Sequence, residues 1–141
     1  MRHVRAWGRR RRMADDFAVE MRRRRRRACA VRLSDGRLVA ARVAATPLSR
    51  LRGLLGRRPP HPALLLIRCH DIHTCGMSAP IDVAFLSGEG QVVKVERAVP
   101  PGQRVFAGAL ACDESASVLE RFSQMGAWVE KGDYPLVPSS L

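Results

Sequence analysis

From Ala28 onward the chain is built of short apolar runs separated by turn residues, and this pattern limits the body to packed strands. Apolar residues alternate with polar ones between Ala28 and Leu33, which predicts a first strand. Asp35-Gly36 then predicts a hairpin turn. The apolar run Leu38–Ala44 predicts the returning strand, so two paired strands should open the fold.

A helix is expected after this hairpin, because Thr46 can cap a helix N-terminus and Pro47 suits its first turn. Four leucines follow at helical spacing and should form one apolar face: Leu48, Leu51, Leu54 and Leu55. The dipeptide Pro59-Pro60 should end the helix.

Three later runs are typical of strands. Ala63–Ile67 is continuously apolar and should be a buried strand, whereas Ile81–Leu86 and Val92–Val99 flank a glycine-rich turn and predict a second hairpin. Residues 117–125 are consistent with either a helix or a strand and turn, since Val118 and Phe122 have helical spacing. The predicted fold class is α+β: a compact β-rich domain, barrel-like or strongly twisted and antiparallel, with one or two short helices.

Residues 1–27 have a different character from the body. They hold twelve arginines against three acidic residues, so nine of the formal +12 charges lie there. Such dense like charge predicts a disordered tail, followed by one domain over residues 28–141. Six consecutive arginines are the candidate polyanion-binding residues: Arg22, Arg23, Arg24, Arg25, Arg26 and Arg27. They would contact nucleic acid or an anionic membrane weakly and without specificity.

The length of the apolar stretches predicts where the protein is located. Phe17–Val19 is too short for a secretory signal, and Ala63–Ile67 is too short to cross a bilayer. We therefore expect a cytoplasmic protein with no transmembrane segment. In that compartment the four cysteines are expected to be buried thiols and not disulfides: Cys29, Cys69, Cys75 and Cys112.

Three segments together resemble the domain of unknown function 192 family, found in bacteria and archaea. They are Thr46–Arg57, Ile72–Met77 and Pro80–Leu86, and the resemblance covers about residues 30–137. The end of the family pattern is matched by Val118-Leu119-Glu120 and by Gly132-Asp133. The resemblance implies a compact β-rich α+β domain with no established activity.

Side chains that can bind metals or act as nucleophiles and bases are concentrated between Cys69 and Met77. If Ile72–Met77 is extended, His73, Cys75 and Met77 project to one face, and Thr74 to the other. This row predicts the wall of a ligand pocket.

Two sharper hypotheses use the same segment. Cys69, His70, His73 and Cys75 are candidate soft-metal ligands, although their spacing matches no established zinc pattern, so neither metal nor cofactor is expected. Alternatively Cys75 could be a nucleophile with His73 as its base and Asp82 as the orienting group.

Asp82 interrupts an otherwise apolar strand, so it must have a partner if it is buried. Arg104, Arg50 or nearby backbone amides are the candidates, and a carboxylate facing the ligand is the alternative.

The leading hypothesis is a non-enzymatic binding or accessory domain for an unknown protein or small molecule. Its candidate ligand-binding residues are His73, Thr74, Cys75, Met77, Asp82 and Arg104. The alternatives are a small metal- or thiol-dependent enzyme that uses these residues, and polyanion binding by the tail.

Overall fold

The structure, a computed structural model, describes residues 28–108 and 116–137. The arginine-rich segment with Arg22–Arg27 and the fourth cysteine, Cys112, lie outside these residues. The predictions of a disordered tail and of its polyanion contacts therefore stay predictions.

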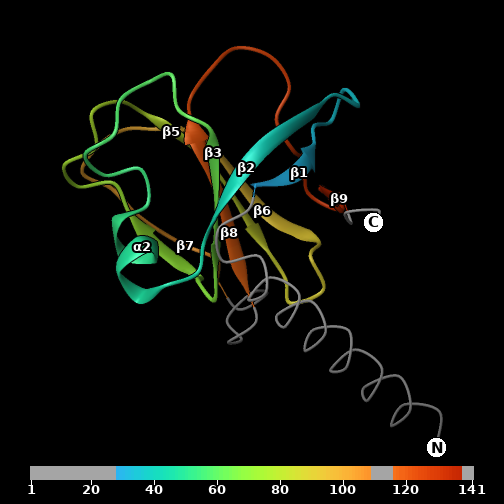
Figure 1. Ribbon diagram of the computed structural model, residues 1–141, viewed down its shortest axis with the longest axis horizontal. Helices are drawn as coiled ribbons and strands as arrows, with labels where there is room; N and C mark the ends of the chain where they lie inside the picture. The colour runs from blue at the N-terminus through green and yellow to red at the C-terminus, as the bar shows by residue number, and fades with distance from the viewer. Residues whose placement is uncertain (1–27, 109–115, 138–141) are drawn as a thin grey trace, which may run out of the picture.

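The described chain is β-rich, with a strongly curled sheet and, within its two described stretches, one short helix (Figure 1). The strands are β1 (Ala28–Arg32), β2 (Leu38–Ala44), β3 (Ala63–Ile67), β4 (Asp71–His73), β5 (Ile81–Leu86), β6 (Val92–Val99), β7 (Arg104–Phe106), β8 (Ser117–Phe122) and β9 (Leu136–Val137). The helix α2 spans Pro47–Arg52. Seven strands form one sheet in the order β6-β5-β8-β3-β2-β1-β9, while β4 and β7 pair separately.

The first hairpin forms as its sequence predicts. β1 pairs antiparallel with β2, and the turn is closed by the Leu33 amide, which donates to the Arg37 carbonyl at 2.8 Å. Gly36 has a φ of 88°, which a residue without a side chain adopts without strain. The Asp35 carboxylate accepts hydrogen bonds from the Arg37 amide and guanidinium and so stabilises the turn.

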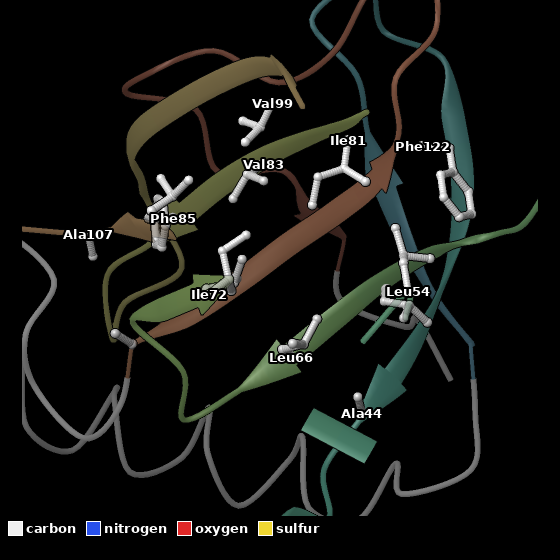
Figure 2. Packing of buried hydrophobic residues seen from close by; sticks show 14 residues of the cluster. Ala44, Leu54, Leu66, Ile72, Ile81, Val83, Phe85, Val99, Ala107 and Phe122 are labelled. Carbon is white, nitrogen blue, oxygen red and sulfur yellow. The ribbon is translucent and has the colours of Figure 1, made fainter. Parts of the chain in front are cut away.

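The strand β3 lies at the centre of the sheet, parallel to β2 and antiparallel to β8. All its residues are buried because both faces of the sheet are covered at this point. Leu64 and Leu66 join one apolar cluster, and Ala63, Leu65 and Ile67 join the other. Figure 2 shows the first cluster, in which Leu66 lies near Ile72 over the strands of the sheet.

The second predicted hairpin, β5 with β6, is also present, and its first arm is entirely buried. Residues 117–122, for which the sequence left helix and strand open, form the strand β8 between β5 and β3. The helical spacing of Val118 and Phe122 does not produce a helix there, because pairing on both sides uses the backbone groups of β8 in the sheet.

The helix α2 begins as predicted and ends early. The Thr46 hydroxyl accepts a hydrogen bond from the Ser49 amide, and the Ser49 hydroxyl accepts one from the Thr46 amide, a reciprocal cap. The predicted apolar face is wrong, since Leu48 and Leu51 are 76% and 70% exposed. Gly53 follows the helix with a φ of 48°, so the chain leaves the helical path long before the prolines at 59 and 60.

The segment Ile72–Met77 is also less extended than expected. β4 ends at His73, and the Met77 amide donates to the Thr74 carbonyl at 3.1 Å, which closes a turn. Gly76 has a φ of 80° in this turn. A single row of His73, Cys75 and Met77 therefore does not form.

Figure 1 shows β1 and β9 at one side of the molecule and α2 with β7 at the other. No helix within residues 28–108 and 116–137 is both long enough and apolar enough to cross a membrane.

Candidate functional site

A cavity of about 70 Å³ lies where the helix α2 and the strand β4 meet the sheet. Its lining residues come from α2 and the turn that follows, from β3, from β4 and its turn, and from β8. They are Arg50, Leu51, Arg52, Gly53, Leu66, Asp71, Ile72, His73, Met77 and Glu120. We call this space the α2 cavity.

Glu120 is the buried acid of the α2 cavity. Its Oε1 has no hydrogen-bond partner among the described residues, although the Leu54 amide donates a hydrogen bond to the carboxyl group. Burial raises the pKa of Glu120 to about 7, and the Leu54 hydrogen bond opposes this shift only in part. Both the neutral acid and the carboxylate are therefore populated near neutral pH.

Gly53 makes room for this acid. A Cβ atom added at Gly53 would overlap Glu120 Oε1, and the positive φ of Gly53 also disfavours a side chain. Both the space that Glu120 needs and the backbone conformation therefore require glycine at position 53.

Arg50 supplies a second unsatisfied group. Its Nη1 donates to the carbonyl oxygens of Ile67 and Arg68, at 3.2 and 3.1 Å, and these bonds hold the side chain against the end of β3. Its Nε is buried and has no partner in the described part of the chain. The α2 cavity is thus bordered by one unpaired buried acceptor and one unpaired buried donor.

The predicted pocket residues divide between the cavity and its surroundings. His73 and Met77 line the α2 cavity. Thr74 is buried, and its hydroxyl donates to the Pro100 carbonyl and accepts from the Gln103 amide, so it ties the turn to the chain before β7. Cys75 is exposed and is not a lining residue.

Arg104 lies outside the cavity lining and contacts it through Asp71. Its guanidinium holds Asp71, a lining residue, through two hydrogen bonds of 2.6 and 3.2 Å. The same guanidinium lies 4.5 Å from the centre of the Phe106 ring. Arg104 therefore orients one wall of the α2 cavity from outside it.

Asp82 is buried as expected, with different arginine partners. Its Oδ2 pairs with Arg121 Nε at 2.9 Å, and its Oδ1 accepts from the Ala98 amide and pairs with Arg97 Nε at 3.2 Å. Burial raises the pKa of Asp82, but the hydrogen bonds from Ala98, Arg121 and Ser123 and the charge of Arg97 outweigh it, so the pKa lies below its usual value. The expected amide partner is confirmed, whereas neither Arg50 nor Arg104 is the pairing arginine.

The candidate metal ligands do not converge. Among the described residues no three His, Cys, Asp or Glu side chains lie close enough together to hold a metal ion. Cys69 donates its thiol hydrogen to the Asp71 carbonyl, and burial raises the pKa of this thiol. Cys69 and Cys75 are free thiols, but of the three described cysteines only Cys29 is fully buried, so burial of all of them was a wrong prediction.

Glu120 was not identified from the sequence as a cavity residue, nor was Arg121 identified as the partner of Asp82. A signal was present, because Glu120 and Arg121 stand between Leu119 and Phe122 in a run that is otherwise apolar. Charged residues inside a buried strand need partners, so this pair warranted the same attention as Asp82.

The geometry defines a class of protein: a small β-rich domain whose curled seven-stranded sheet borders a small cavity beside a short helix. The profile of the domain of unknown function 192 family, described as uncharacterized ACR, matches residues 30–125, and the chain belongs to this family.

Two solved structures are similar in fold. A protein of unknown function from Novosphingobium aromaticivorans has a TM-score of 0.56 at 16% identity, over 68% of this chain and 72% of the other. A putative transcription regulator from Sinorhizobium meliloti has a TM-score of 0.52 at 22% identity, over 70% of this chain and 82% of the other. At these identities the likeness shows the fold alone. No curated protein matches this chain.

Proposed function

We propose that this chain is a binding domain without a catalytic step of its own, and that the α2 cavity holds a small neutral ligand with a hydrogen-bond donor and an acceptor. The observation that carries the proposal is the pair of unsatisfied buried atoms, Glu120 Oε1 and Arg50 Nε, at one cavity. A buried polar atom without a partner destabilises the fold, because it has lost its hydrogen bonds to water. A ligand that hydrogen-bonds to both atoms would remove this penalty.

The size of the cavity limits the ligand. One water molecule needs roughly 10 to 15 Å³ of such space, so about 70 Å³ admits a group of only a few heavy atoms. An amide or an alcohol with a short carbon chain fits, and so does the polar end of a larger molecule or of a protein side chain. His73 and Met77 then form the wall that contacts its carbon atoms.

The enzymatic alternative uses Cys75, His73 and Asp82, and the positions of these residues favour binding instead. Cys75 lies outside the cavity lining, and both carboxylate oxygens of Asp82 already have partners on β6 and β8. Stoichiometric metal in protein purified without a tag would favour the metal-dependent alternative.

Acetamide is a suitable probe, because it carries both hydrogen-bonding groups and is small enough for the α2 cavity. We expect saturable shifts of the Gly53 and Leu54 amide resonances in an NMR titration at pH 7, with a Kd on the order of 10 mM. Glu120→Leu should weaken binding at least tenfold while the domain stays folded, since an apolar residue there leaves no buried acid unpaired.

The matched control is Glu130→Leu, the same change at an exposed position. It should leave the titration unchanged. Equal binding by the Glu120→Leu and unaltered proteins would contradict the proposal.

Polyanion binding by residues 1–27 is a second candidate function, favoured by the concentration of nine of the twelve net positive charges there. Replacing the six residues Arg22–Arg27 by glutamine should make the slope of log affinity for duplex DNA against log salt shallower by about 5, if all six contact phosphates. Fluorescence anisotropy at several salt concentrations measures the slope.

The control for this experiment replaces exposed Arg37 and Arg58 of the body by glutamine. A slope that depends more on these two residues than on the six-arginine block would place the polyanion contact on the folded body.

A further inference from the structure

A second, larger cavity of about 300 Å³ lies between the loop at residues 59–62 and the end of β8. Its walls are largely apolar, with Val39 and Ala40 of β2, Ala63 of β3 and Phe122 of β8. We call it the Trp128 cavity, because the indole of Trp128 forms part of its lining. Its volume lies at the lower end of the range for small-molecule sites.

Two lining residues of this cavity carry a hydrogen-bond donor without an acceptor. Arg121 Nη2 and Trp128 Nε1 have no partner in the part of the chain that the structure describes. Both side chains are more than nine-tenths buried, at 5% and 2% exposed. The guanidinium carbon of Arg121 lies 4.3 Å from the centre of the Trp128 ring, so the two donors belong to one stacked pair. Neither group can accept a hydrogen bond, so the partner of each must be a hydrogen-bond acceptor.

The local charge favours an anion. Arg121 and Arg97 both pair with Asp82, so two guanidinium groups share one carboxylate and one positive charge is left over. His61, which also lines the cavity, has its ring nitrogens 3.1 Å from Arg57 Nη1 and 2.8 Å from the Pro62 carbonyl, so it leaves no acceptor for the two donors.

We propose that the Trp128 cavity binds a small organic acid with one carboxylate and an apolar body, and that Arg121 Nη2 and Trp128 Nε1 donate to its carboxylate. The apolar walls contact the body of the acid. Asp82 is a positioning residue for this site, because its bond to Arg121 Nε fixes the orientation of the guanidinium that carries Nη2.

This site is separate from the α2 cavity. Glu120 and Arg121 are neighbours in β8, so their side chains point to opposite faces of the sheet. Glu120 lines the α2 cavity and Arg121 lines the Trp128 cavity. The two cavities should therefore differ in preference, since an anion would be repelled by the Glu120 carboxylate and attracted by Arg121.

Benzoate is the probe for the second site, and benzyl alcohol is its matched analogue without the carboxylate. In an NMR titration of the full chain, benzoate should shift the Trp128 indole N–H resonance saturably, with a Kd on the order of 1 mM. The Trp128→Phe variant lacks the indole N–H, so the resonance that disappears in its spectrum is that of Trp128. Binding to this variant is followed at the Gln124 amide and should be about tenfold weaker. Benzyl alcohol should bind at least tenfold more weakly than benzoate.

A second variant tests the cavity without changing a donor. Ala40 is exposed at the cavity lining, so Ala40→Phe should fill the space and abolish the benzoate shifts. Ala28→Phe makes the same change at an exposed position of β1 outside the cavity and should have no effect. Undiminished benzoate binding by Ala40→Phe, or equal affinities for benzoate and benzyl alcohol, would overturn the proposal.

Discussion

Replacing Asp82 by asparagine is expected to lower the free energy of unfolding by about 3 to 5 kcal/mol. The carboxylate is completely buried, and the substitution leaves Arg121 in the interior without its counter-charge. Asparagine has nearly the same shape, so the loss measures the charge and its hydrogen bonds and not a cavity. Urea unfolding of the full chain gives the difference.

The control is Glu130→Gln, which makes the same chemical change at an exposed residue and should cost under about 0.5 kcal/mol. A double variant, Asp82→Asn with Arg121→Gln, should lose less than the sum of the two single variants, because the second change removes the charge that the first leaves unpaired. Equal urea midpoints for Asp82→Asn and Glu130→Gln would contradict the buried pair.

The parts of the fold that depend on local sequence are the parts that the sequence predicts. The turn at Asp35-Gly36, the cap at Thr46 and the apolar run Ala63–Ile67 are each specified within a few residues. Neighbouring side chains and backbone preferences decide these features, so they need no knowledge of the rest of the chain.

The features that depend on distant contacts are not predictable in the same way. β8 is a strand because it lies between β3 and β5, and its own sequence also fits a helix. The helix α2 ends after six residues at Gly53, and Leu48 and Leu51 within it are exposed, so the expected apolar face is not buried. Periodicity describes which face a helix would bury, but not how long the helix continues.

The candidate site shows the same division. His73 and Met77 were identified from their chemistry, and they do line a cavity. Glu120 lies near them only because of the order of the strands in the sheet. Arg121 pairs with Asp82, which lies 39 positions earlier in the sequence. The sequence could predict that Asp82 needs a partner, but the identity of the partner follows from the register of β5 with β8.

Glu120→Gln is expected to change how stability depends on pH. Burial raises the pKa of Glu120 from 4.5 to about 7 in the folded state, so the folded chain binds this proton more tightly than the unfolded chain. The stability that the neutral acid contributes is fully present below pH 4.5 and is lost as the pH rises through 7. A shift of this size corresponds to roughly 3 kcal/mol.

Glutamine keeps the shape of the neutral acid and cannot ionise. The stability of the Glu120→Gln variant should therefore not fall as the pH rises through 7. The free energy of unfolding of Glu120→Gln minus that of the unaltered chain should therefore rise by about 3 kcal/mol between pH 4.5 and pH 8. Taking the difference between the two proteins removes the contribution of Asp82, whose lowered pKa affects both proteins equally and acts at more acid pH. Urea unfolding at four or five pH values measures it, and a difference that stays constant across this range would show that Glu120 is ionised in the fold.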